Sequence, residues 1–399
     1  MLRCGSLLLV VLMLGAAQTA PLTDADRQRA MQLCDEHKSV AALPLLERLA
    51  AERPKDYVVF ERLGFAVLLN SAGIRDPEAS RQERIRARKI LLQAQALGDD
   101  SNLLQVLLAG LPEDGSTAPF SKNLEVEAVM RDSEAAFGRG DLEQALDGYI
   151  KAFALDPHLY EAALFAGDSY FKLKDHARAC EWYARAVEVS ADRETAFRYW
   201  GDALMAMGEP AQARPKFMEA LVAEPYLRKS WIGAKQWAER NKLSLSFPKI
   251  TPPNAVSAPS TGTDGKTHIN VMIDPATLGG KNGDQDGRSA WFIYSLNRAA
   301  WPTGRFAKEF PGEKQYRHTL KEEAESLHMV ADQVRTKKVK RLDPQLAVLL
   351  KLDDAGLIEA HVLIAAADQG ISQDYPAYRA AHRDKIRQYL DEYVVPKLP

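Results

Sequence analysis

Cysteine is scarce in this chain: its 399 residues include three, and one of these, Cys4, precedes the first apolar run. Proteins whose folds depend on disulfide bonds usually contain more cysteines than this. We therefore expect Cys34 and Cys180 to be small buried residues rather than the two halves of a bridge.

Charge of one sign is also lacking. The formal net charge is −2, so no overall field favours nucleic acid or an anionic membrane surface. We expect no nucleic-acid partner. Hydrophobic residues make up 46% of the chain and charged residues 27%, which is ordinary for a folded protein. A chain of this length has room for two or three domains.

Apolar runs long enough to cross a membrane are missing as well. The run at residues 7–14 is too short to span a bilayer, but it follows Arg3 and precedes the small residues Gly15, Ala16 and Ala17. This pattern predicts that residues 1–17 are a signal peptide. We expect an exported protein, periplasmic or secreted, with no membrane span after cleavage; an uncleaved anchor is the alternative.

Small residues and aromatics, in contrast, recur at a fixed spacing. Residues 126–159, 160–193 and 194–227 are three tandem copies of one 34-residue pattern, whose positions are called places 1 to 34 below. Place 8 is small, place 20 is Ala, place 24 is aromatic and place 27 is Ala. In the three copies, place 20 is Ala145, Ala179 and Ala213, place 24 is Tyr149, Tyr183 and Phe217, and place 27 is Ala152, Ala186 and Ala220. Small residues at this spacing let two helices pack closely, and the aromatics fill the gap between them.

This pattern resembles the tetratricopeptide repeat (TPR) family. The resemblance implies an all-α fold in which helical hairpins stack into a solenoid. We expect degenerate repeats over residues 23–111, three full units plus a capping helix over 126–243, and a linker rich in Pro, Ser and Thr over 244–267. In the second degenerate unit, an insertion of 11 residues is expected to stretch the turn before Ala87.

Residues 268–399 are expected to form a mostly helical C-terminal domain whose family we do not recognise. It opens with a strand-like run at 268–273, and Trp291, Tyr294 and Trp301 are expected in its core. An apolar stripe from Leu320 to Val334 has helical spacing. We expect the opposite side of that helix to be solvated. The residues on that side are His318, Glu322 and Glu325, with His328 following at helical spacing. A metal site there is the alternative.

The TPR resemblance also implies a binding surface, since the first helix of each unit lines the concave groove. The implied groove residues at places 5, 9 and 12, continuing into the capping helix, are Glu134, Phe137, Asp168, Phe171, Arg198, Asp202, Met205, Ile232 and Gln236. One carboxylate per repeat beside an apolar strip suits a peptide or protein partner with basic residues. Alternatively the acids pair locally, Asp168 with Lys172 and Asp202 with Arg198.

Motifs that suggest chemistry are incomplete. The sequence at 167–170 mimics a nucleophile block, but it falls inside a repeat helix. The run at 279–281 lacks the first Gly and the Ser or Thr of a phosphate-binding loop. Residues 282–287 begin like a calcium loop, yet Ile293 stands where the closing Glu should be. We expect no cofactor.

The sequence therefore predicts an exported TPR scaffold that binds a peptide or protein through its groove and has no catalytic activity. One alternative is an envelope-associated enzyme whose C-terminal domain performs the chemistry while the repeats recruit substrate. The other is a structural subunit of an envelope or secretion assembly.

Overall fold

The structure is a computed structural model, and it describes residues 21–74, 76–253, 260–261, 267–268, 286–337 and 341–398. The expected signal peptide, the strand-like residues 269–273 and the loop motifs at 279–284 lie outside these ranges. The chain divides into two compact units, Met1–Ser169 and Tyr170–Pro399, and each is described by itself.

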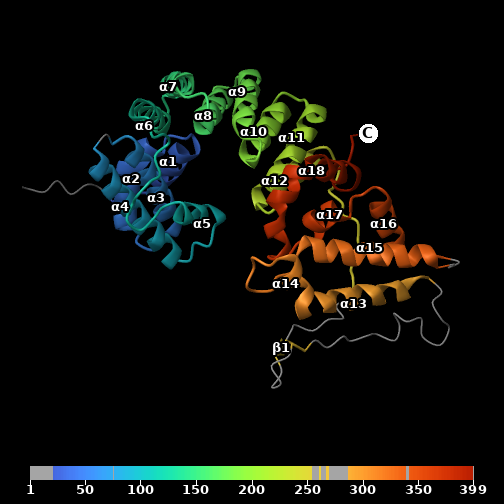
Figure 1. Ribbon diagram of the computed structural model, residues 1–399. Coiled ribbons are helices and arrows are strands. Elements are labelled where there is room, and N and C mark those ends of the chain that lie inside the picture. Colours follow the sequence, from blue (N-terminus) through green and yellow to red (C-terminus); the bar gives the residue numbers. More distant parts are fainter. Residues whose placement is uncertain are drawn as a thin grey trace, which may run out of the picture. The chain divides into compact units, whose positions relative to one another are not determined.

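The described residues form an all-α protein, as the sequence predicts, apart from one short β pair (Figure 1). In that pair β1 (Ser260–Thr261) runs antiparallel to β2 (Thr267–His268). The helices of the first unit are α1 (Asp24–Asp35), α2 (Ser39–Glu52), α3 (Tyr57–Ala72), α4 (Pro77–Ala96), α5 (Asn102–Ala109), α6 (Leu124–Arg139), α7 (Leu142–Leu155) and most of α8 (Tyr160–Lys172). None of the described helices is long and apolar enough to cross a membrane.

Local sequence sets where these helices begin and end. Thr23 starts α1 with a capping box closed by Asp26. Helix α6 ends at Gly140, whose φ of 88° places it in the left-handed region that glycine tolerates best. The chain can therefore reverse within two residues and begin α7. Successive helices pair in this way as antiparallel hairpins, α1 with α2, α3 with α4 and α6 with α7.

The second degenerate hairpin corrects one expectation. The inserted residues do not stretch the turn, since α3 ends at Ala72 and α4 begins at Pro77. They lengthen α4 instead, because Asp76 caps its start and Pro77 at the first helical position is preorganised for a helix. The repeat register is nevertheless kept. A Cβ added to Gly64 at place 8 would lie 2.6 Å from Cγ of Leu91 at place 24.

The second unit continues the hairpins and then adds the C-terminal helices. Its elements are α9 (His176–Val189), α10 (Glu194–Ala206), α11 (Pro210–Ala223), α12 (Arg228–Arg240), η2 (Arg288–Ala290), α13 (Trp291–Ala300), η3 (Trp301–Arg305), α14 (Phe306–Glu309), α15 (Leu320–Thr336), α16 (Pro344–Asp354), α17 (Ile358–His361), η4 (Val362–Ala366), η5 (Ile371–Asp374), α18 (Tyr375–Tyr389) and η6 (Leu390–Val394). Helix α11 packs against its hairpin partner α10 and against the capping helix α12, which also contacts α10.

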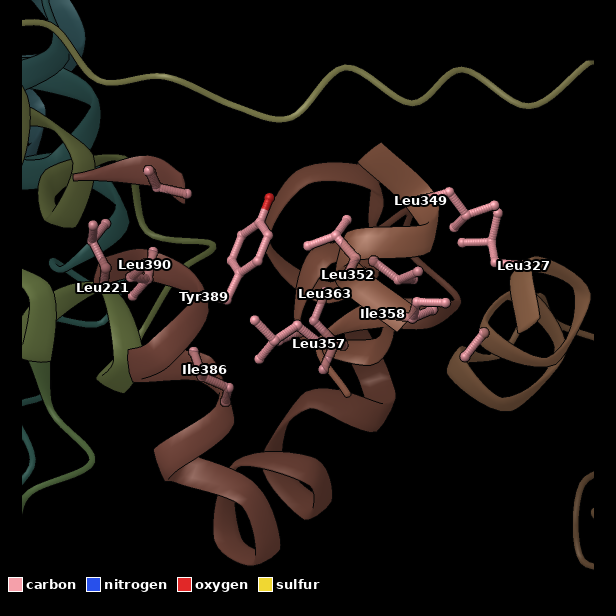
Figure 2. Packing of buried hydrophobic residues seen from close by; sticks show 14 of the residues in the cluster. Leu221, Leu327, Leu349, Leu352, Leu357, Ile358, Leu363, Ile386, Tyr389 and Leu390 are labelled. Atoms are coloured by element: carbon pink, nitrogen blue, oxygen red, sulfur yellow. The ribbon is translucent and has the colours of Figure 1, made fainter. Parts of the chain in front are cut away.

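One apolar core joins the last repeat to the C-terminal helices. Figure 2 shows Leu221 of α11 beside Leu390, with Ile386 and Tyr389 of the same C-terminal segment close by. All four are buried. The cluster extends through α16 and α17 to Leu327 on α15. The expected core residues Trp291, Tyr294 and Trp301 are also buried.

Polar contacts reinforce this junction. The Arg214 guanidinium on α11 donates to the Asp391 carboxylate at 2.6 Å and to the carbonyl oxygens of Val395 and Pro396 at 2.5 and 2.8 Å. The Tyr375 hydroxyl on α18 donates to the Val222 carbonyl at 2.5 Å. The C-terminal helices therefore cover α11 directly, although residues 244–267 separate them from the repeats in sequence.

Candidate binding surface

In the first unit, the expected groove residue Glu134 is held within its own hairpin. Its carboxylate on α6 accepts a hydrogen bond from the buried Tyr149 hydroxyl on α7. Burial raises the pKa of Glu134, and the bond from Tyr149 opposes that rise. Burial raises the pKa of Tyr149, and the negative charges of Glu134 and, to a lesser degree, of Asp168 on α8 raise it further.

The close approach of α6 and α7 makes this bond possible. A Cβ added to Gly148 would lie 1.9 Å from the Ser133 hydroxyl oxygen, so only glycine allows the helices to come this near. Phe165 packs edge-on against the Tyr149 ring, with centroids 5.5 Å apart. The nearby Phe137 on α6 is half-buried.

In the second unit, the expected residues fall on α10, α12 and the end of α8. Arg198, Asp202 and Met205 recur at i, i+4 and i+7 on α10, so they share one side of that helix. Ile232 and Gln236 are exposed on α12. These five residues are called the α10–α12 face below. Phe171, near the end of α8, packs against the His176 ring with centroids 4.8 Å apart.

The two helices of the α10–α12 face touch through Arg198. A Cβ on Gly233 of α12 would lie 3.1 Å from Cδ and Cγ of Arg198. The guanidinium itself turns to Glu194, donating to the two carboxylate oxygens at 2.8 and 3.1 Å. Glu194 is buried, so the charge of Arg198 is paired with a carboxylate of the same helix.

Asp202 is left without such a partner. It is half-buried, and it makes no hydrogen bond or ion pair with any residue in the described part of the chain. Burial raises the pKa of Asp202, and the charges of Arg198 and Arg240 only partly oppose this. The third repeat carries Phe217 at place 24, where the first carries Tyr149, so no phenol reaches its carboxylate.

For Arg198, local pairing takes a different form from the one considered from sequence. Arg198 pairs with Glu194 rather than with Asp202, because Glu194 lies one turn earlier and is buried beside it. The partner of Glu134, Tyr149, was missed. The tyrosine or phenylalanine at place 24 is the sequence signal that could have revealed it.

The expectation of a solvated face on α15 is wrong. Glu322 is 0% exposed, Glu323 is buried beside it and the His318 side chain is mostly buried. The reason is that α13 packs on a second side of α15, the side that carries Glu322 and Glu323, so this helix is covered on two sides. No group of metal-binding residues occurs among the residues that the structure describes.

Comparison with known proteins gives no matching family model and no matching curated protein. Among solved structures, the first TPR of Spaghetti (RPAP3) bound to the HSP90 peptide SRMEEVD is 20% identical, with 30% of this chain and 98% of that chain covered and a TM-score of 0.28. YrrB, a TPR protein with an unusual peptide-binding site, is 12% identical over 53% of this chain and 90% of its own, with a TM-score of 0.28. MamA from Desulfovibrio magneticus RS-1 is 14% identical over 51% and 96%, with a TM-score of 0.26.

The chain's own geometry shows which class of helical repeat it contains. The hairpins α6–α7 and α10–α11 bury the alanines of places 20 and 27 and the aromatic of place 24. Gly201 at place 8 rests on the Phe217 ring at place 24, as Gly64 rests on Leu91. The repeats are therefore helical hairpins of the tetratricopeptide type, as the sequence pattern indicates.

Proposed function

We propose that this protein is an exported, non-catalytic scaffold whose α10–α12 face captures a basic segment of a peptide or protein partner. The observation that carries the proposal is the unpaired carboxylate of Asp202. A half-buried carboxylate without a partner is costly, because it has lost hydration and gained no hydrogen bond in return.

A lysine or arginine side chain from a partner would supply the missing donor. Hydrogen bonds to charged groups are worth about 1.5–3 kcal/mol, more than bonds between neutral groups. Arg198 competes little for Asp202, because Glu194 already holds its guanidinium. The partner's basic residue therefore has a defined contact on α10.

The neighbouring side chains fit an apolar residue next to that basic one. Ile232 is 38% exposed on α12, and Met205 is partly exposed one helical turn beyond Asp202. Gln236 adds an amide that can bond to a peptide backbone. The α10–α12 face thus suits a short segment in which lysine or arginine alternates with aliphatic residues.

The test uses two fluorescent peptides of equal length, one alternating Lys and Leu and one alternating Glu and Leu. We expect the mature protein to bind the Lys peptide more tightly, as measured by fluorescence anisotropy. Asp202→Asn keeps the shape and removes the charge, so the affinity for the Lys peptide should fall roughly tenfold or more. Asp147→Asn, an exposed residue on α7, is the matched control and should change nothing.

Two results would count against the proposal. If neither peptide binds, the α10–α12 face is not a peptide site of this kind. If the Lys peptide binds equally to wild type and to Asp202→Asn, the basic residue is held elsewhere. Export is tested separately, by comparing the cell fractions that contain the chain with and without residues 1–17.

A further inference from the structure

A network of ionisable side chains is buried in the C-terminal helices, and the proposed binding function does not use it. Tyr294 and Arg298 enter it from α13, and Glu322 and Glu323 from the first turn of α15. The segment before α15 contributes Tyr316 and His318, and the segment after η4 contributes Asp368. This set of seven residues is called the α13–α15 cluster below.

Contacts within the α13–α15 cluster are short. Tyr316 donates to the two oxygens of Glu322 at 2.9 and 3.1 Å, and Tyr294 donates to the two oxygens of Glu323 at 2.9 Å. Nη1 of Arg298 lies 3.0 Å from Oε1 of Glu322 and 3.4 Å from Oε2 of Glu323. Neither approach has the alignment of a hydrogen bond, so Arg298 acts on both carboxylates mainly through its charge.

His318 connects this network to a second segment. Its Nδ1 is 2.7 Å from Oδ2 of Asp368, and its Nε2 is 3.1 Å from Oε2 of Glu323. A neutral imidazole has a single N–H and can donate to one carboxylate only. For both contacts to be hydrogen bonds, the ring must be protonated or one of the two carboxyls, Glu323 or Asp368, must carry a proton. The two hydrogen bonds together therefore require one proton more than a neutral His318 and two ionised carboxylates would hold.

The count of charges leads to the same requirement. Two buried carboxylates, Glu322 and Glu323, face the single guanidinium of Arg298. Asp368 adds a further negative charge, but its side chain is half-exposed and is screened by water. An unpaired negative charge in a buried site is costly, and binding one proton removes it.

We propose that the α13–α15 cluster is a proton-operated latch, which keeps residues 310–319 and 366–374 closed on α15 while it holds one shared proton and releases them when that proton is lost. The proton belongs to the cluster as a whole, because groups this close titrate together. Tyr316 and Asp368 are partly exposed, so protons can exchange with solvent through them.

The working range follows from the two pKa shifts. Burial raises the pKa of Glu322 to about 7 and, with the charge of Arg298, lowers the pKa of His318 to about 4. The raised carboxyl pKa gives stability at low pH that is lost as the pH rises through 7. The lowered imidazole pKa gives stability at high pH that is lost as the pH falls through 4. Above pH 4 the imidazole is neutral, so between these limits the cluster keeps its one proton on the buried carboxyls Glu322 and Glu323, and it opens on the alkaline side near pH 7.

The second released segment leads into the helix that docks on the repeats. Asp374 accepts from Arg317 at 2.7 Å and from the Leu320 backbone at 2.8 Å, immediately before α18 begins. Further along α18, Arg379 and Arg383 pair with Asp192 at 2.9 and 3.2 Å. Opening the latch therefore loosens the segment that positions α18 on the second and third repeats, since Arg383 also pairs with Glu219 of α11 at 3.1 Å.

The test is hydrogen–deuterium exchange of the full chain at pH 6 and pH 8, with rates corrected for the intrinsic effect of pH. Peptides covering 310–319 and 366–374 should lose about tenfold or more of their protection at pH 8. Glu322→Gln imitates the protonated carboxyl and should keep its protection at both pH values. Glu325→Gln, on the same helix and paired with Arg305 instead, is the matched control and should behave like wild type.

A graded variant keeps the test decisive if Glu322→Gln does not fold. Tyr316→Phe removes a donor to the charged form of Glu322, so it should move the opening midpoint upward by about one pH unit. Equal protection of wild type at pH 6 and pH 8 would overturn the latch. So would a Glu322→Gln protein that still opens at pH 8, or an opening midpoint unmoved by Tyr316→Phe.

Discussion

At the scale of single residues, one hydroxyl group distinguishes the repeats. Tyr149 completes the hydrogen bonding of Glu134 in the first repeat, whereas Phe217 in the third leaves Asp202 without a bond. Place 24 fills the space between two helices, and tyrosine and phenylalanine fill it almost equally well. In these two repeats, the choice between them therefore decides whether the place 9 carboxylate has a hydrogen-bond donor within its own hairpin.

Removing the Tyr149 hydroxyl tests this internal role. Tyr149→Phe should lower the free energy of unfolding of the first unit by about 1–3 kcal/mol at pH 7, because Glu134 is left buried and charged without its donor. The loss should become smaller at acid pH, where Glu134 is protonated. Urea unfolding at several pH values measures both effects. A variant as stable as wild type at pH 7 would show that Glu134 is solvated without Tyr149.

At the scale of elements, hairpin periodicity was readable from sequence and the surroundings of each helix were not. Alanines and aromatics at places 20, 24 and 27 predicted the hairpins, since these residues lie in the contact between two sequential helices. The sides of α15 could not be assigned in this way. Its stripe from Leu320 to Val334 marks one buried side, but α13 covers another side that carries Glu322 and Glu323. Buried carboxylates paired across helices look like a solvated face in the sequence.

The same distinction holds for the candidate site: the positions of its residues on the helix could be predicted, and their buried partners could not. The repeat register placed Asp202 and Met205 on one side of α10, and the structure puts them there. The register gave no information on Glu194 as the partner of Arg198, because Glu194 is buried only through contacts made in the folded chain. That these residues bind a partner stays a prediction.

His328 is a second example of an element contact hidden in the sequence. It lies on α15 between Asp353 of α16 and Glu359 of α17, with Nε2 3.3 Å from Glu359 Oε1. The ring donates hydrogen bonds to Glu359 and to Asp353, and these bonds raise the pKa of His328 to about 9. Its contribution to stability is therefore complete below the ordinary histidine pKa and is lost as the pH rises through 9.

An NMR titration of the His328 ring protons should give a midpoint near pH 9. Glu359→Gln removes one of the two acceptors that favour the charged ring and should move the midpoint downward. His158, an exposed histidine of the first unit, is the internal control and should not respond to this variant. A His328 midpoint at the ordinary histidine value would show that the carboxylates do not hold the ring in solution.

At the scale of the whole molecule, the C-terminal helices extend the core of the last repeat. Solenoid repeats need a terminal cap, because each unit buries only one side of its neighbour. Helix α12 supplies part of that cap, but Leu221 on α11 is buried together with Ile386 and Leu390 of the C-terminal segment. The repeat pattern ends before residue 244 and cannot indicate which later residues complete this core.

This shared core changes what is expected of a repeat-only fragment. The sequence pattern favours independent folding of residues 126–243, whereas the structure indicates that cutting there exposes the side of α11 that α18 and η6 cover. Each buried aliphatic side chain that becomes exposed costs about 1.5–3 kcal/mol, and Arg214 loses its carboxylate and carbonyl partners as well. Residues 126–243 should therefore unfold at a clearly lower urea concentration than residues 126–399, as followed by far-ultraviolet circular dichroism.

Leu221→Ala should destabilise the longer fragment by about 2–5 kcal/mol and the shorter one by less, because in the shorter fragment that side chain is already partly exposed. Equal midpoints for the two fragments would show that α12 alone caps the repeats and that the C-terminal helices only rest on them.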